Sequence, residues 1–257
     1  MTRQEFNKAC ANRETTFGCY ILEYMRPQTA RILALAGYDW IWIDNEHCAH
    51  SYESIQEVIR TAHDVGITSI VRVGKTDYSR IAQIFDIGAD GIIVPRVETP
   101  EQARTIIDAA KFPPKGKRGF GMRPLVFNTM SISMADSIAD QNDTRFVIVQ
   151  IESRKGVENL EAILDIAEGN ISAVMLGPAD FQIDIGKVGQ PDTPEFEEAA
   201  QRVSDICAAR GIPAGIPAGS VDHAHKWIAR GYSMVCLGSD DGFMVAGAAR
   251  TVKKLRG

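Results

Sequence analysis

The chain has 257 residues, of which 45% are hydrophobic and 24% charged, with a formal net charge of −5. It is long enough to bury a substantial core, and its scattered Lys and Arg residues argue against a nucleic-acid-binding surface. No apolar run is long enough to span a membrane, the N-terminus lacks a signal-peptide pattern, and the five cysteines form no CxxC pair. We therefore expect a reduced, cytoplasmic protein without a membrane partner.

Short apolar runs alternate with helical patterns along the chain, which is typical of βαβ units and a parallel sheet. The predicted strands are Thr16–Ile21, Trp40–Asp44, Thr68–Val73, Gly91–Val94, Phe146–Ile151, Ala173–Leu176, Pro213–Ile216 and Met234–Gly238. The predicted helices are Gln28–Ala36, Tyr52–Val65, Tyr78–Ile87, Pro100–Ala110, Val157–Glu168, Pro194–Arg210, Asp222–Ala229 and Gly242–Leu255.

Eight strands, each followed by a helix, predict a single α/β domain over residues 1–257 with the (β/α)₈ architecture of a TIM barrel. A doubly wound open sheet is the alternative, but the first strand is not followed by the Gly-rich phosphate-binding pattern of that fold. One long connection, residues 112–144, interrupts the alternation, and Met130–Asp140 within it has the pattern of a short helix. Long connections inside a compact domain are often functional.

Two acids follow neighbouring predicted strands. Glu152 closes the run that begins at Phe146, and Asp180 follows the strand Ala173–Leu176 in the segment Gly177-Pro178-Ala179-Asp180. One helix separates the two strands, so their carboxyl ends should meet at one rim of the sheet. Two carboxylates at such a rim are suitable ligands for Mg²⁺ or Mn²⁺, with water or substrate filling the other positions. Two acids that cap unrelated elements are the structural alternative.

Further polar residues follow the second and third strands. Asp44-Asn45-Glu46-His47 comes after Trp40–Asp44, and Arg72 lies near the end of the next strand. A histidine side chain titrates near neutral pH, so His47 is a candidate for proton transfer, with Asp44 beside it. Arg72 offers a planar fork for a carboxylate or an enolate, although it could instead form an ion pair with the same acids. The backbone N–H groups of the turn Gly177-Pro178-Ala179-Asp180 could bind a substrate carboxylate.

These residues occur in an order that resembles the HpcH/HpaI aldolase family of metal-dependent (class II) pyruvate aldolases, which includes 2-keto-3-deoxy-sugar-acid aldolases. The similar segments span roughly residues 15–245 and are Gly37–Trp40, Asp44–His47, Val71–Val73, Gly91–Val97, Pro113–Gly119, Gln150–Glu152 and Leu176–Asp180. Each segment alone is weakly specific, whereas their combination is highly specific.

The resemblance implies a divalent metal ion (Mg²⁺, Mn²⁺ or Co²⁺) on Glu152 and Asp180, chelated by a 2-keto acid. It further implies that Arg72 stabilises the enolate, that His47 moves the proton and that Gln150 lines the metal pocket. The backbone of Ala179 and Asp180 would hold the substrate carboxylate.

The resemblance also implies a homotrimer or homohexamer in which the last helix is exchanged between subunits. In this family an acid that matches Asp86 supports the histidine. Asp86 precedes the fourth predicted strand, on the face opposite to His47, so we expect it to act only across a subunit interface.

The expected reaction is cleavage of a 4-hydroxy-2-keto acid to pyruvate and an aldehyde through a metal-stabilised pyruvate enolate. The alternatives are oxaloacetate decarboxylation, a macrophomate-synthase-like condensation on the same site, and a barrel that binds a keto acid without turnover. The chain departs from the family pattern at residues 122–127, 181–184 and 237–240, which are expected to contact the aldehyde half.

Overall fold

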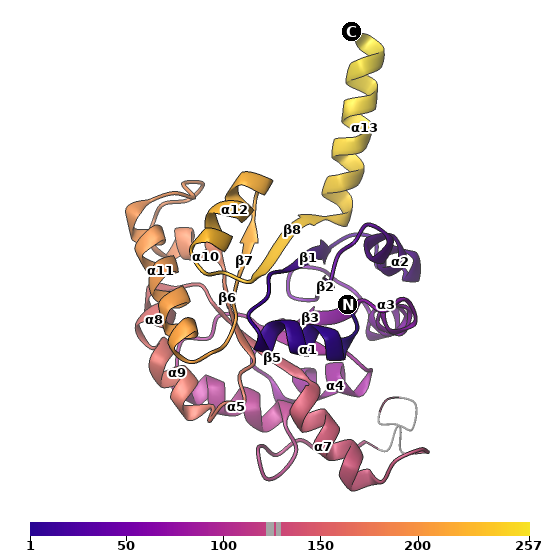
Figure 1. The fold of residues 1–257 in the computed structure, drawn as a ribbon, viewed down its shortest axis with the longest axis vertical. Coiled ribbons are helices and arrows are strands. Elements are labelled where there is room, and N and C mark those ends of the chain that lie inside the picture. The colour runs from indigo at the N-terminus through magenta and orange to yellow at the C-terminus, as the bar shows by residue number, and fades with distance from the viewer. Residues whose placement is uncertain (122–125, 127–129) are drawn as a thin grey trace.

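The computed structural model describes residues 1–121, 126 and 130–257. Eight parallel strands form a closed barrel in chain order, with β8 paired to β1 (Figure 1). The strands are β1 Thr16–Ile21, β2 Trp40–Asp44, β3 Thr68–Arg72, β4 Gly91–Val94, β5 Phe146–Ile151, β6 Ala173–Leu176, β7 Ala214–Ala218 and β8 Met234–Ser239. The predicted (β/α)₈ barrel is confirmed, and β7 alone begins and ends later than predicted.

Helices alternate with the strands along the chain. They are α1 Arg3–Ala11, α2 Pro27–Leu35, α3 Tyr52–Val65, α4 Tyr78–Asp86, α5 Pro100–Ala110, α7 Met134–Thr144, α8 Arg154–Glu158, α9 Leu160–Ile166, α10 Pro178–Asp184, α11 Pro194–Ala209, α12 Val221–Ala229 and α13 Asp240–Arg256. The single helix predicted over Val157–Glu168 is wrong, because the chain breaks at Asn159, whose side chain donates to the carbonyl of Glu98 at 2.8 Å. Within the described residues, no helix is long and apolar enough to cross a membrane.

Large side chains fill the interior of the barrel. Trp40, Trp42 and Phe146 are buried there, and Phe6 of α1 packs on Phe146 with ring centroids 4.9 Å apart. Gly91 makes room for this packing, since a Cβ atom at Gly91 would lie 2.7 Å from the Cβ of Phe146. Helix α1, which the sequence analysis did not predict, therefore contributes to the core inside the barrel.

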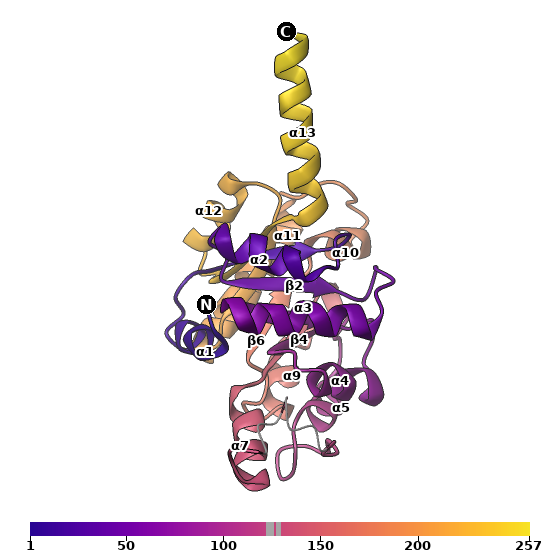
Figure 2. The same ribbon diagram turned by 90° about the vertical axis from the view of Figure 1, so that its right-hand side faces the viewer.

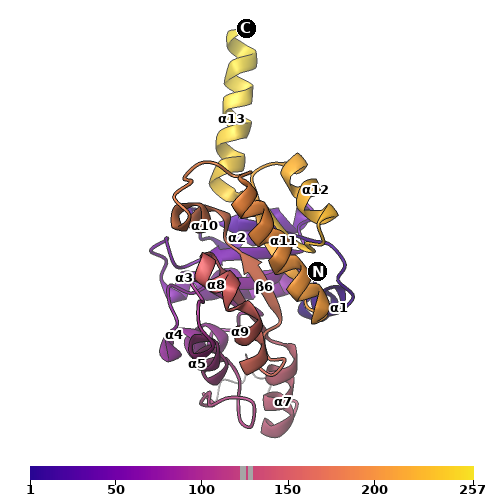
Figure 3. The ribbon, with the colours of Figure 1, turned by 90° about the vertical axis from the view of Figure 1, so that its left-hand side faces the viewer.

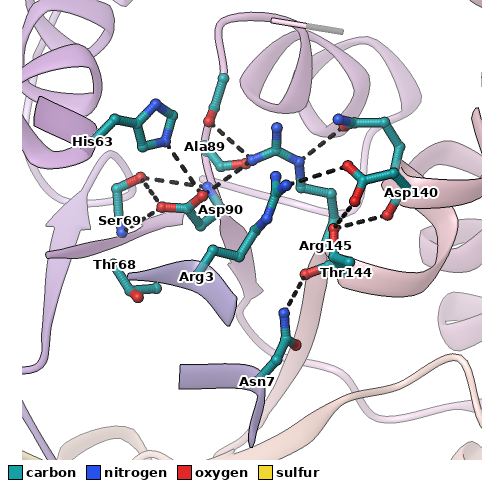
Figure 4. Close-up of polar contacts among 12 residues, drawn as sticks. Arg3, Asn7, His63, Thr68, Ser69, Ala89, Asp90, Asp140, Thr144 and Arg145 are labelled. Atoms are coloured by element: carbon teal, nitrogen blue, oxygen red, sulfur yellow. Dashed lines mark hydrogen bonds and ion pairs between the residues drawn. The ribbon is translucent and has the colours of Figure 1, made fainter. Parts of the chain in front are cut away.

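A polar network ties together the amino-terminal ends of β3, β4 and β5 (Figure 4). The buried carboxylate of Asp90 accepts hydrogen bonds from the backbone and hydroxyl of Ser69, both at 3.0 Å. It also lies 3.2 Å from Arg145 Nη1 and 3.3 Å from His63 Nε2. Arg145 in addition donates to the carbonyl of Ala89 at 2.7 Å. These contacts fix the starts of three strands that carry polar groups at their other ends.

A cavity of about 790 Å³ lies beside this network, and its lining includes Arg3, His63, Asp90 and Arg145. Its charged groups are largely paired within the protein, since Arg3 lies 3.2 Å from Asp140 and Asp90 is held as described above. The cavity lies at the amino-terminal end of the strands. Chemistry in (β/α)₈ barrels takes place at the opposite, carboxyl-terminal end, so we assign this region a structural role.

Helix α13 projects away from the barrel (Figures 1, 2 and 3). None of its residues is buried, and its apolar side chains Phe243, Met244 and Val245 are exposed. Its start is fixed, because the carboxylate of Asp240 accepts hydrogen bonds from the backbone N–H groups of Leu22 at 3.0 Å and Tyr24 at 2.6 Å. The helix therefore leaves the barrel in a defined direction with an apolar surface that this subunit does not cover.

Candidate active site

Polar side chains from β2, β3 and the loop after β2 form one connected group at the carboxyl-terminal end of the barrel. The β2–β3 register places Asp44 opposite Arg72. Arg72 donates from Nε and Nη2 to the two carboxylate oxygens of Asp44 at 3.0 and 2.6 Å. Its Nη1 lies 3.2 Å from Glu46, whose carboxylate lies 3.6 Å from His47 Nε2. The predicted residues Asp44, Arg72 and His47 thus lie together, and Glu46 links them.

Electrostatics hold Arg72 and Asp44 as a charged pair. Burial would raise the pKa of Asp44, but the hydrogen bonds and charge of Arg72 outweigh it and hold that pKa below its usual value. The guanidinium of Arg72 also lies over the ring of Trp42, 5.3 Å from its centroid, and Tyr20 packs on the same indole at 4.7 Å. Arg72 is therefore oriented by two acids and an aromatic ring.

Glu152 follows β5, and its carboxylate is held from two sides. Gln150 Nε2 donates to Oε2 at 2.5 Å, and the backbone N–H of Arg96 donates to Oε1 at 2.8 Å. Burial and the nearby charge of Asp180 raise the pKa of Glu152 to about 7. The charge of Asp180 thus acts on Glu152, and the protein leaves the two acids without full charge compensation.

Helix α10 brings Asp180 to the site. Gly177 is the residue before its first turn and has no side chain with which to cap it. The N–H groups of Ala179 and Asp180 precede the first hydrogen bond within the helix and so remain available to a ligand. Pro178 occupies the first helical position, where its missing N–H costs nothing. A Cβ atom at Gly177 would lie 2.5 Å from Glu152 Oε2, so the absence of a side chain there makes room for the carboxylate.

Asp86 lies away from this group. It is the last residue of α4 and therefore faces the amino-terminal side of the barrel. Its carboxylate pairs with the buried Arg118 at 2.6 Å. Within one subunit Asp86 does not belong to the site, and its action across a subunit interface remains a prediction.

The positions expected to contact the aldehyde half differ in their surroundings. Phe181 is buried against Phe196, with ring centroids 5.7 Å apart, so it belongs to the core. The carboxylate of Asp240 holds the loop after β1, as described above. Of residues 122–127, only Val126 is among the described residues, and the prediction for the others lies outside them.

The sequence analysis missed Arg96. This residue follows β4, and its backbone adopts the left-handed conformation with φ of 56°. Besides its backbone bond to Glu152, its Nη2 lies 4.0 Å from Asp180 Oδ1. Its place after a strand end within the segment Gly91–Val97 was the available signal.

The acid pair fits a divalent cation. Glu152 and Asp180 supply hard oxygen donors, and the buried Gln150 Oε1 beside them has no hydrogen-bond partner among the described residues. In the part of the chain that the structure describes, no three His, Cys, Asp or Glu side chains gather closely enough to hold a metal alone. Two carboxylates with water and substrate oxygens form a typical Mg²⁺ site, so the donor set is suitable.

Comparison with characterised proteins gives close relatives along almost the whole chain. A hydroxypyruvate/pyruvate aldolase of Chromohalobacter salexigens is 31% identical over 250 residues, with 97% of both chains covered. A 5-keto-4-deoxy-D-glucarate aldolase of Shigella dysenteriae is 30% identical over 240 residues, with 93% of this chain and 91% of the relative covered.

Solved structures agree. An HpcH/HpaI aldolase from Desulfitobacterium hafniense superposes with a TM-score of 0.91 at 28% identity, covering 97% of this chain and 95% of the other. Macrophomate synthase superposes with a TM-score of 0.80 at 29% identity, and the match covers 98% of this chain and 89% of the other. The sequence model of HpcH/HpaI aldolase/citrate lyase matches residues 17–246. The chain therefore belongs to the HpcH/HpaI aldolase/citrate lyase family.

Proposed function

We propose that this protein is a divalent-metal-dependent aldolase that cleaves 4-hydroxy-2-keto acids to pyruvate and an aldehyde, and also catalyses the reverse addition. The observation that carries the proposal is the incompletely compensated pair of the buried Glu152 and the half-buried Asp180, at the same end of the barrel as Arg72. A bound Mg²⁺, Mn²⁺ or Co²⁺ would supply Lewis-acid polarisation of the 2-keto group. Glu152 and Asp180 would hold the ion.

Arg72 and His47 have separate roles in this reaction. Arg72 is fixed by Asp44 and Glu46 and places positive charge beside the keto acid, so it stabilises the negative charge that develops on the pyruvate half as the C3–C4 bond breaks. His47, beside Glu46, accepts the proton of the C4 hydroxyl, directly or through a water molecule. The released aldehyde carries the former C4 oxygen, and a proton added to C3 completes pyruvate.

The remaining groups position the substrate. The N–H groups of Ala179 and Asp180 would bind the keto-acid carboxylate at the start of α10, where the helix dipole favours negative charge. Gln150 keeps the Glu152 carboxylate in place and lines the pocket. Glu152 and Asp180 thus lie close to the N–H groups that orient the keto acid.

The proposal is tested by the exchange of pyruvate methyl protons for deuterium, followed by NMR in D₂O. The metal-stripped protein should be inactive, and added Mg²⁺, Mn²⁺ or Co²⁺ should restore an exchange that His47→Ala greatly slows. This assay requires no knowledge of the aldehyde. Absence of exchange with all three metals would refute the proposed function.

A second candidate function uses the same residues. Similarity to macrophomate synthase favours an enzyme that decarboxylates oxaloacetate or adds the resulting enolate to another acceptor. Pyruvate formation from oxaloacetate much faster than aldehyde release from any 4-hydroxy-2-keto acid would support this alternative.

We also propose that the protein is a homotrimer or homohexamer held together by exchange of α13. The exposed apolar residues Phe243, Met244 and Val245 support this, because an isolated subunit leaves them in water. Exchange would also allow Asp86 of a neighbouring subunit to support His47. An oligomer-breaking variant with undiminished His47-dependent activity would exclude that role of Asp86.

The five free cysteines support a reducing, cytoplasmic location.

A further inference from the structure

The carboxylate of Asp240, the first residue of α13, holds the loop that follows β1. Its two oxygens accept hydrogen bonds from three successive backbone N–H groups, those of Leu22 at 3.0 Å, Glu23 at 3.2 Å and Tyr24 at 2.6 Å. Successive N–H groups that converge on one anion form a nest. Because every donor belongs to the main chain, the position of Asp240 determines the path of the backbone in this loop.

The same loop is bound from its other side by the segment that carries His47. His50, between β2 and α3, places Nε2 2.8 Å from the carbonyl oxygen of Leu22, and since a carbonyl only accepts, Nε2 is the donor. Leu22 thus has its N–H bound by Asp240 and its carbonyl bound by His50. A single residue of backbone therefore connects the start of α13 to the loop after β2.

His47 lies between two fixed points of the loop after β2. On one side, Asp44 accepts a hydrogen bond from the backbone N–H of Glu46 at 2.9 Å. On the other side, His50 is bound to Leu22. The side chain of His47 is 63% exposed, and its Nε2 lies 3.6 Å from Glu46, beyond hydrogen-bond distance. Because the imidazole is mostly exposed, the two ends of the loop, rather than packing around the ring, determine where it lies.

We propose that Asp240 and His50 are positioning residues for His47, and that they hold its loop together through the backbone of Leu22. This inference rests on the proposed function, in which His47 moves a proton. In this arrangement neither residue acts on the reacting atoms, since each acts through Leu22. Loss of either contact frees one end of the loop, and misplacement of a proton-transfer group by about 1 Å can cost about 100-fold in rate.

The test removes each contact in turn and follows pyruvate proton exchange at saturating Mn²⁺. D240N weakens the anion that the three N–H groups surround, and H50F loses the donor to Leu22 but keeps a ring of similar size. Each should lower kcat for exchange by about 10-fold, while KM for pyruvate and the affinity for Mn²⁺ change by less than about twofold. H50Q should recover most of the rate, because the glutamine amide also donates a hydrogen bond.

Dependence on His47 separates positioning from a general structural role. In the H47A background there is no imidazole to place, so D240N and H50F should leave the residual exchange within about twofold. Light scattering should show the wild-type oligomer for both variants. A neighbouring subunit then remains present, and its loss does not explain the slower exchange.

The matched controls are D241N and H223F. Asp241 carries the same charge in the first turn of α13, but its carboxylate accepts a hydrogen bond from Ser239 Oγ at 2.5 Å. His223 of α12 places Nε2 3.3 Å from the carboxylate of Asp192. Both controls should keep the wild-type kcat for exchange.

Unchanged kcat in either D240N or H50F would overturn the inference. A full loss of rate in the H47A background, a parallel loss of Mn²⁺ affinity, or slow exchange only in dissociated protein would overturn it as well. Exchange by the wild type preserves the proposed function in all of these cases. Absence of exchange in the wild type with Mg²⁺, Mn²⁺ and Co²⁺ would instead refute the proposed function, and the inference with it.

Discussion

Replacement of Gly177 by alanine should displace the Glu152 carboxylate without disturbing the fold. The φ and ψ angles of Gly177, −99° and 98°, lie within the region open to any residue, so the substitution causes no backbone strain. The added Cβ atom would lie 2.5 Å from Glu152 Oε2 and 2.8 Å from both Glu152 Cβ and Gln150 Nε2. Ordinary contacts begin near 3.4 Å, so the carboxylate oxygen must move by about 1 Å.

A shift of this size is large for a catalytic site. Misplacement of reacting groups by about 1 Å can cost about 100-fold in rate, and overpacking of this kind typically costs about 1–3 kcal/mol of stability. Gln150 cannot follow the carboxylate freely, since it is buried and faces the same added atom. We therefore expect weaker metal binding and about 100-fold slower pyruvate exchange in a protein that still folds.

The assay combines Mn²⁺ titration calorimetry, pyruvate proton exchange and thermal unfolding. Gly219→Ala is the matched control: this glycine follows β7, has no positive φ, and a Cβ atom there would have nothing within 4 Å. The control should behave as wild type in all three measurements. Wild-type metal affinity and exchange in Gly177→Ala would refute the argument that the close approach of Gly177 to Glu152 positions the metal ligand.

Three further predictions concern the same site. Glu152→Ala should abolish metal binding and turnover together in calorimetry and exchange assays, and full residual activity would exclude this metal site. Arg72→Lys keeps the charge but loses the two-point contact with Asp44, so steady-state kinetics should show kcat falling about tenfold or more with a smaller rise in KM. Because burial and Asp180 raise the pKa of Glu152 to about 7, protons compete with the metal below that pH. Mn²⁺ affinity should therefore fall about tenfold per pH unit below 7, whereas a constant affinity from pH 5 to 8 would contradict this.

The sequence predicted the barrel well because its strands are short apolar runs bounded by clear turns. The bounds of β1, β2, β4, β5 and β6 agree with those predicted. Helix α1 was missed because only three of its residues, Phe6, Ala9 and Cys10, are buried. Its apolar residues therefore do not repeat with a clear helical spacing in the sequence. The break between α8 and α9 was missed because it depends on the contact of Asn159 with Glu98, a residue distant in the sequence.

Part of the site followed from topology alone. Residues at the ends of adjacent parallel strands must meet, which is why Asp44 and Arg72 were found together. The environment of Glu152 could not be predicted in this way. Its partner Arg96 binds through a backbone N–H in a left-handed conformation, and no local pattern of side chains encodes that contact.

Two buried acids at opposite ends of the barrel, Asp90 and Glu152, have opposite pKa shifts, and this contrast supports the assignment of function. At the amino-terminal end, burial alone would raise the pKa of Asp90, but His63 and Arg145 lower it below its usual value. At the carboxyl-terminal end, Glu152 is also buried, but burial and the charge of the neighbouring Asp180 together raise its pKa. A scaffold that can neutralise a buried carboxylate completely at one end leaves one uncompensated at the other. An uncompensated acid is costly unless a cation binds there, so the site is prepared for a positively charged ligand that the chain itself does not supply.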